Sequence, residues 1–165
     1  MKKIILLSDT HGVLDKRIIK HLKSVDEVWH AGDIGDILVC DEIKKHCLTT
    51  RVVFGNIDNN ILRAEFHKDL FFNCEDVKVW MTHIGGYPPK YRGEIKSIIK
   101  AQGIKLFVCG HSHILKVIYD KELKCLHMNP GAIGTYGIHQ VQTALKFKVD
   151  KGEIKELCIV ELEKS

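Results

Sequence analysis

Five short motifs in this sequence place carboxylate, amide or imidazole side chains close together along the chain. The motifs are Asp9-x-His11, Gly32-Asp33, Gly55-Asn56, Thr82-His83 and Gly110-His111-Ser112-His113. Their seven oxygen and nitrogen donors are Asp9, His11, Asp33, Asn56, His83, His111 and His113. Seven donors exceed the number that a hydrolytic triad uses, and they suit two adjacent divalent cations. Mixed nitrogen and oxygen donors without a thiolate fit Mn²⁺, Fe²⁺, Zn²⁺ or Ni²⁺ and argue against Ca²⁺.

Each motif alone has an ordinary structural explanation. An Asp-x-His pair is common in turns where the carboxylate caps the backbone, and Gly-Asp and Gly-Asn are common in loops. The Gly-His-x-His motif is more informative, because alternation along an extended segment directs both imidazoles to one side. The metal interpretation therefore depends on all five motifs occurring together, each at the end of a predicted strand.

A stretch of apolar residues precedes each motif and predicts a buried strand. The predicted strands lie at 3–7, 25–29, 51–54, 77–82 and 106–109. In open α/β sheets, ligands bind in the crevice beyond the carboxyl ends of the strands. We therefore expect the five strand ends to deliver the seven donors to one edge.

Helical spacing of apolar residues alternates with these strands in the first two-thirds of the chain. It predicts helices at 13–23, at 34–46 and near 91–102, the last with Gly103 as its C-cap. A further strand is predicted at 70–73, and paired strands with hairpin turns follow from Leu115 onward. The pattern indicates an α/β layered domain with helices outside. Because no linker or repeat interrupts the chain, we expect one domain over 1–165.

Composition narrows the class of protein. The chain has 165 residues, 45% hydrophobic and 28% charged, which is typical of globular proteins and excludes collagen-like and disordered chains. No apolar run approaches the roughly 20 residues of a membrane span, and the run at 4–7 is too short for a secretory signal. We therefore expect a cytoplasmic protein that does not bind membranes. The six cysteines show no C-x-x-C spacing, which predicts reduced, buried thiols.

The net charge of +4 is a mild basic excess. The basic residues are scattered rather than gathered in a run, which favours an ordinary solvated surface over a nucleic-acid stripe.

Taken together, the five motifs resemble the five-block signature of the calcineurin-like metallophosphoesterases. The resemblance extends from Lys3 to at least Gly131 and includes Asp58 in the third block. The short chain and the Asn129-Pro130-Gly131 block resemble the small YfcE-like phosphodiesterase branch. This resemblance implies an α/β fold, a four-layer αββα sandwich of two mixed β-sheets flanked by helices, with the metals between strand ends.

The resemblance also implies a ligand set and a reaction. One metal would be held by Asp9, His11, Asp33 and His113. The second would be held by Asp33, Asn56, His83 and His111, with Asp33 bridging. The catalytic residues would be Asp33, Asn56 and His83, and a metal-bridging hydroxide would attack the phosphorus of a small-molecule phosphodiester. Among the divalent ions that suit these donors, the family habit favours Mn²⁺.

One position departs from the family pattern. The third block of the family usually has His after Asn, where it acts near the leaving group, but Ile57 stands there in this chain. An isoleucine cannot donate a proton, so general acid catalysis, which typically contributes about 10²–10⁴-fold, would be missing. Four further residues are candidates for supporting the site or contacting substrate: His30, Asp58, Tyr87 and Asn129.

Two alternatives stay open. The first is a catalytically quiet scaffold that uses this fold to bind a protein partner, as the phosphoesterase-like subunit of retromer does. Completeness of the seven donors favours the enzyme. The second is a nuclease, which the absence of an extended basic and aromatic groove disfavours. We therefore expect no nucleic-acid partner, and a homo-oligomer remains open.

Overall fold

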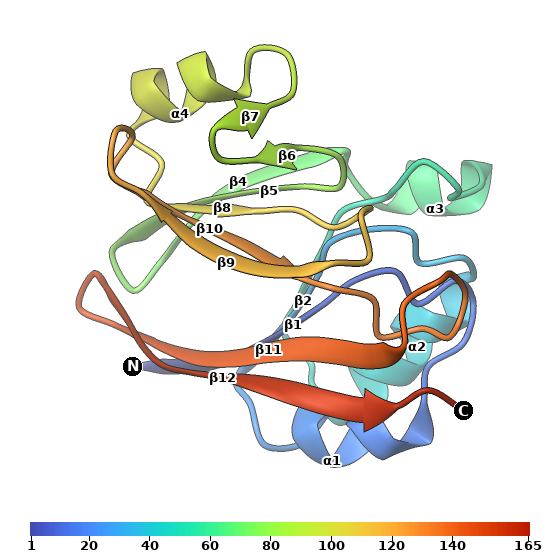
Figure 1. The fold of residues 1–165 in the computed structure, drawn as a ribbon. Coiled ribbons are helices and arrows are strands. Elements are labelled where there is room, and N and C mark those ends of the chain that lie inside the picture. Colours follow the sequence, from blue (N-terminus) through green and yellow to red (C-terminus); the bar gives the residue numbers. More distant parts are fainter.

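Two five-stranded mixed sheets face each other in the computed structural model, which describes residues 1–165 (Figure 1). The first sheet has the strand order β12-β11-β1-β2-β3. Its strands are β1 (Lys2–Leu7), β2 (Glu27–His30), β3 (Thr50–Val52), β11 (Val141–Asp150) and β12 (Glu153–Glu163). The first three run parallel, whereas β11 and β12 add antiparallel strands beside β1.

The second sheet has the order β4-β5-β8-β10-β9. Its strands are β4 (Asp69–Cys74), β5 (Val77–Thr82), β8 (Leu106–Val108), β9 (Leu115–Asp120) and β10 (Cys125–Pro130). Strands β5, β8 and β10 are parallel, and β4 and β9 pair antiparallel at the two edges.

Helices cover the outer face of each sheet (Figure 1). The first sheet carries a 3-10 helix η1 (Lys16–Ile18), α1 (Ile19–Leu22) and α2 (Ile37–His46), and the second carries α4 (Ile95–Gln102). The short helix α3 (Asn60–Glu65) and the hairpin of β6 (Gly86–Tyr87) and β7 (Lys90–Tyr91) complete the chain. No helix of the structure is long and apolar enough to cross a membrane.

The uninterrupted apolar run of β1 reflects burial on both faces of the first sheet. Ile4 and Leu6 lie between the two sheets, in a core that includes Trp29. Ile5 and Leu7 belong to the core between the sheet and helices α1 and α2. A third core lies between the second sheet and α4. These layers confirm the predicted four-layer sandwich.

The helices begin later than the apolar pattern predicts. In the 13–23 segment, helical structure starts only at Lys16, because Asp15 accepts a hydrogen bond from the backbone N–H of Arg17 as the N-cap. In the 34–46 segment, Asp36 is the N-cap, so α2 starts at Ile37 rather than at the predicted residue 34. The predicted C-cap Gly103 has a left-handed φ of 64°, as expected.

The sequence did not predict the β6–β7 hairpin or helix α3. The segment at 91–94 is not helical because Tyr91 pairs with Gly86 in the β6–β7 hairpin, so α4 starts at Ile95. Helix α3 has only six residues and buries only Leu62, which is too short for a recognisable apolar period. The cysteine prediction is confirmed except at Cys158, which is exposed; all six thiols are free.

A buried carboxylate lies at the amino end of β2. Glu27 is 1% exposed and accepts hydrogen bonds from Nζ of Lys2, Nε of Arg51 (2.9 Å) and Nε1 of Trp29 (2.9 Å). Burial alone would raise the pKa of Glu27, but Arg51, Lys2 and Trp29 outweigh it and lower the pKa to about 2. The ionised carboxylate therefore stabilises the folded state.

Replacing Glu27 by Gln should lower the free energy of unfolding at pH 7 by about 1.5–3 kcal/mol, because charged hydrogen bonds are replaced by neutral ones. The carboxylate contributes fully above its ordinary pKa of 4.5, and the contribution disappears as the pH falls toward 2. Urea unfolding at several pH values should therefore show wild type and variant converging below pH ~4.5. The matched change Glu42→Gln, at an exposed ion pair with Lys45, should have a much smaller effect. A difference that does not change with pH would contradict this account of Glu27.

Candidate metal centre

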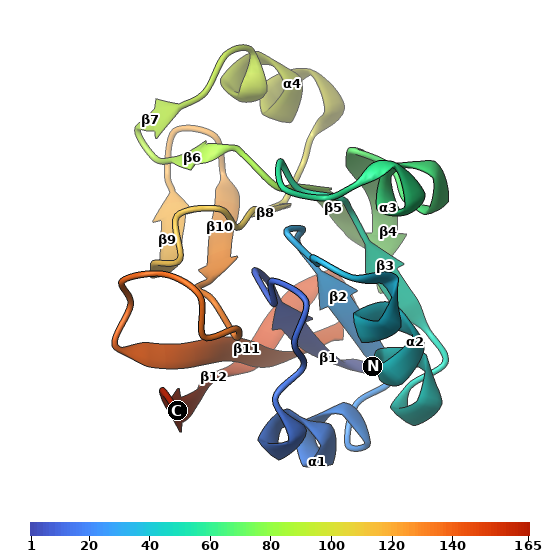
Figure 2. The ribbon, with the colours of Figure 1, turned by 90° about the vertical axis from the view of Figure 1, so that its right-hand side faces the viewer.

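The carboxyl ends of parallel strands from both sheets meet on one side of the molecule, which faces the viewer in Figure 2. Asp9 and His11 follow β1, Asp33 follows β2, and Asn56 follows β3. The other three donors come from the second sheet, where His83 follows β5 and His111 and His113 follow β8. The single edge predicted from the sequence is thus a junction between two sheets.

Five of the seven donors have a left-handed backbone conformation. Their φ angles are 57° at Asp9, 48° at His11, 53° at Asp33, 71° at His111 and 60° at His113. Residues other than glycine rarely adopt such angles, and the strain persists only where surrounding contacts impose it. Here the backbone bonds Asp9 N–H to Gly32 O and His11 N–H to Asp33 O hold the two loops together. Strain of this kind is typical of functional sites.

The first cluster consists of Asp9, His11 and His113, whose potential ligand atoms lie within 4.8 Å of one another. Nε2 of His113 lies 3.2 Å from Oδ1 of Asp9. The other oxygen, Oδ2, accepts hydrogen bonds from Oγ of Ser8 (2.6 Å) and the backbone N–H of His111 (3.1 Å). Burial alone would raise the pKa of Asp9, but the neighbouring imidazoles of His11 and His113 outweigh it and hold the pKa below its usual range.

The second cluster consists of Asp33, His83 and His111, also within 4.8 Å. Nε2 of His83 lies 3.2 Å from Oδ1 of Asp33, and Nδ1 lies 2.7 Å from the backbone oxygen of Ala31. Because a carbonyl only accepts, Nδ1 carries the hydrogen and Nε2 is left facing Asp33. Oδ1 of Asn56 lies 3.0 Å from Nδ1 of His111, so the amide belongs to this cluster as well.

Asp33 connects the two clusters. Its Oδ1 faces His83, and its Oδ2 lies 3.7 Å from Nε2 of His11 in the first cluster. A Cβ atom at Gly32 would lie 2.6 Å from Nδ1 of His83, so only glycine lets this loop approach the imidazole so closely.

The donor atoms fit a pair of divalent cations. Oδ1 of Asp9, Nε2 of His11 and Nε2 of His83 are buried and have no hydrogen-bond partner in the protein. Buried polar atoms are normally paired, and each unpaired one costs free energy. Three such atoms converging from two sheets, all of them nitrogen or carboxylate oxygen, are what a bound metal pair would satisfy.

His30 supports the loops that carry the donors. It is fully buried, and its Nδ1 accepts from the backbone N–H of Gly32 (3.1 Å). Oγ1 of Thr10 donates to the backbone oxygen of Ile34 (2.8 Å), so it accepts from Nε2 of His30 (3.0 Å). Burial lowers the pKa of His30 to about 4. With both nitrogens in use, His30 is a neutral positioning residue out of reach of substrate.

Asp58 has a role that the family pattern did not predict. Its carboxylate is buried and accepts backbone N–H bonds from Gly55 (2.7 Å), Gly35 (2.8 Å) and Ile34 (3.2 Å). It therefore ties the loop of Asp33 to the loop of Asn56.

The remaining candidates lie on the side of His111. Asn129 is buried and donates to the backbone oxygen of Gly110 (2.9 Å) and to Oγ of Ser112 (3.1 Å), so it holds the loop of His111. Tyr87 is 39% exposed and lines the same cavity as His111 and Asn129, of about 190 Å³. Tyr87 is thus placed where it could contact a substrate.

Two residues near the first cluster escaped the sequence analysis. The ring of Tyr136 stacks on His11 at 4.7 Å, and the ring of His139 meets His113 edge-on at 5.3 Å. Both belong to the segment between β10 and β11, which carries none of the five motifs. No spacing in the sequence signals that this segment returns to the site.

A four-layer sandwich with carboxylate and imidazole donors gathered between its sheets defines the class of metallophosphoesterases. The sequence profile of the calcineurin-like phosphoesterase superfamily domain matches residues 1–152. The chain therefore belongs to this superfamily, which confirms the resemblance drawn from the motifs.

One relative and two solved structures are similar to this chain. A probable metallophosphoesterase of Methanocaldococcus jannaschii is 27% identical over 134 residues, which cover 77% of this chain and 66% of that protein. A novel archaeal phosphodiesterase has a TM-score of 0.76 at 21% identity, covering 96% of this chain and 99% of that one. Vps29 of Entamoeba histolytica complexed with Zn²⁺ has a TM-score of 0.75 at 14% identity, covering 99% of each chain. The two solved structures establish the shared fold.

Proposed function

We propose that this chain is a metal-dependent phosphodiesterase that acts on small-molecule diesters, with residues 1–165 working as one domain. The observation that carries the proposal is the convergence of three buried, unpartnered donor atoms, on Asp9, His11 and His83, between the two sheets. Membership of the phosphoesterase superfamily and the fold shared with an archaeal phosphodiesterase support the reaction class.

In this proposal each cluster holds one divalent ion, and Asp33 is shared. Asp9, His11 and His113 complete the first set, and Asn56, His83 and His111 complete the second. When bound, two such ions would lower the pKa of a water molecule and neutralise charge on the phosphoryl oxygens. The donor chemistry suits Mn²⁺, the ion that we propose, as well as Zn²⁺, Fe²⁺ and Ni²⁺.

The side chains then have separate tasks. Asp33, Asn56 and His83 border the reacting phosphate and form the catalytic set. The donors carry only two negative charges, so a site loaded with two divalent cations stays positive and attracts an anionic diester. Ile57 supplies no proton to the leaving group, which favours diesters that lose a weakly basic alcohol or phenol.

The test is an activity assay on metal-stripped protein. Mn²⁺, Zn²⁺ or Mg²⁺ is added back in the presence of bis(p-nitrophenyl) phosphate or p-nitrophenyl phosphate. We expect metal-dependent turnover of the diester and slower turnover of the monoester. Absence of turnover of both esters with every metal would contradict the proposal.

That negative result would favour a protein-interaction scaffold instead. The observation behind this second candidate is the fold shared with Vps29 over nearly the whole chain. A scaffold has no need of unpartnered donors facing one another, and for this reason the enzyme is the better-supported function.

A further inference from the structure

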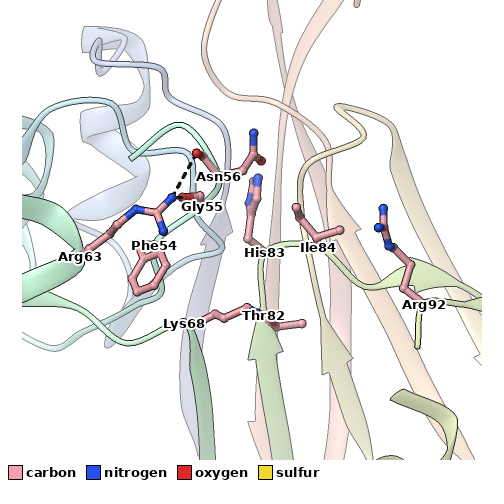
Figure 3. Close-up of a pocket in the computed structure, with 9 residues that line it drawn as sticks. All are labelled: Phe54, Gly55, Asn56, Arg63, Lys68, Thr82, His83, Ile84 and Arg92. Atoms are coloured by element: carbon pink, nitrogen blue, oxygen red, sulfur yellow. Dashed lines mark hydrogen bonds between the residues drawn. The ribbon is translucent and has the colours of Figure 1, made fainter. Parts of the chain in front are cut away.

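A second feature of the site is a cavity of about 430 Å³ that opens beside Asn56 and His83 (Figure 3). Its walls come from the loop after β3, from helix α3, from the residue before β4, from the end of β5 and from the segments that follow β5 and β7. The volume far exceeds that of a single phosphate group and falls in the range of small-molecule sites. The cavity can therefore hold more of a substrate than its scissile phosphate.

Three cationic side chains line this cavity: Arg63, Lys68 and Arg92. No aspartate or glutamate is among its lining residues, and none of the three cations forms an ion pair in the structure. Elsewhere on this protein, lysines and arginines near a carboxylate do pair, as Arg17 does with Asp15. Three uncompensated positive charges around one cavity make it strongly attractive to an anion.

Arg63 is held in place by the loop that carries Asn56. Its Nε donates to the backbone oxygen of Asp58 (2.7 Å), and its Nη2 donates to that of Asn56 (3.2 Å). Its guanidinium also lies over the ring of Phe54, 4.8 Å from the centroid. These contacts fix the plane of the guanidinium group, while its Nη1 has no hydrogen-bond partner in the protein. Nη1 is therefore a preorganised hydrogen-bond donor for an anion.

The three cations line different walls of the cavity. In Figure 3, Arg63 and Arg92 stand on opposite sides of His83, and Lys68 lies lower, beside Thr82. Arg92 also lines the neighbouring cavity of about 190 Å³ next to His111. A substrate whose phosphodiester reaches His83 would therefore bring its attached groups against these cations.

We propose that Arg63, Lys68 and Arg92 form a subsite for a second phosphate on the substrate, so that the diester hydrolysed here carries a further phosphate on one of its arms. The inference rests on the proposed function and specifies its substrate class. A phosphate dianion offers three acceptor oxygens and close to two charges, which suits two guanidinium groups and an ammonium group better than a carboxylate does.

Two p-nitrophenyl diesters of the same nucleoside test this subsite, one with a further phosphate on the sugar and one without. We expect kcat/KM to favour the phosphorylated diester by about tenfold or more, since the added phosphate would gain charge-assisted hydrogen bonds that the other diester lacks. In Lys68→Gln or Arg92→Gln, the preference should fall by about five- to tenfold. The matched change Lys20→Gln, on α1 beyond the first sheet, should keep the preference of the wild type.

A binding measurement separates failure of the subsite from failure of the enzyme proposal. Calorimetry on the metal-free protein compares the nucleoside bisphosphate with the monophosphate, with no hydrolysis involved. We expect tighter binding of the bisphosphate, and loss of that difference in Lys68→Gln and Arg92→Gln. Arg63 is left intact because it also positions the Asn56 loop. Equal affinities for the two ligands, or a difference that both variants retain, would overturn the subsite whatever the activity assays show.

Discussion

Replacing Asp33 by Asn should leave the protein with less than half of its metal and should lower diester hydrolysis by about 10²–10³-fold or more. Asp33 faces His83 of one cluster with Oδ1 and His11 of the other with Oδ2. Asparagine keeps the shape but removes the charge and one acceptor oxygen. Both proposed sites therefore weaken together. Metal content by mass spectrometry and kcat/KM on the diester measure the two effects.

Two further variants serve as comparisons. Asp36→Asn makes the same chemical change three residues away, where asparagine is an equally good N-cap for α2, so metal and activity should stay at wild-type values. Asp9→Asn belongs to the first cluster alone and should reduce total metal less than Asp33→Asn does. Full metal content together with retained activity in Asp33→Asn would refute the shared-ligand assignment.

Replacing Ile57 by His should raise monoester hydrolysis relative to diester hydrolysis by about tenfold to a hundredfold, the low end of general acid catalysis. A monoester gains most from a proton donor because its dianion expels a poor leaving group. Ile57 is 47% exposed, and only its backbone N–H is bonded to Asp33, so an imidazole fits without disturbing the core. The gain stays modest because the oxygens of Asp58 already accept three backbone bonds and would not orient the ring.

The matched variant Ile61→His places the same imidazole on an exposed position of α3 and should not change the ratio.

The activity of the wild-type protein should also fall steeply as the leaving-group pKa rises, a trend that Ile57→His should flatten. A wild-type rate independent of leaving group, with chemistry limiting, would mean that another residue donates the proton. An unchanged ester ratio in folded, metal-loaded Ile57→His would show that position 57 does not adjoin the leaving group.

The site was predictable from the sequence because its donors follow strands. The run at 4–7 is apolar throughout because this part of the strand is buried on both faces, and it marks the following Asp9 and His11 as lying at a sheet edge. The motifs do not reveal which sheet each strand joins. Strands β1 and β5 look alike in sequence, yet they belong to different sheets, and pairing depends on long-range contacts.

Residues outside the motifs were missed for a different reason. Arg63, Lys68 and Arg92 are separated along the chain and look like ordinary surface charges until α3 and the β6–β7 hairpin bring them to one cavity. Tyr136 and His139 likewise reach the first cluster only because the segment after β10 folds back over it. Short helices and short hairpins have too few residues for a detectable apolar period, so the surroundings of the donors could not be read from the sequence.

The central claim is that the two clusters hold two divalent ions between the sheets. The most direct measurement is anomalous diffraction from a crystal of this protein grown with Mn²⁺. The account predicts two anomalous peaks, one bordered by Asp9, His11 and His113 and the other by Asn56, His83 and His111, with Asp33 contacting both. A single peak, or none at these residues in crystals that diffract well enough to show Mn²⁺, would contradict it.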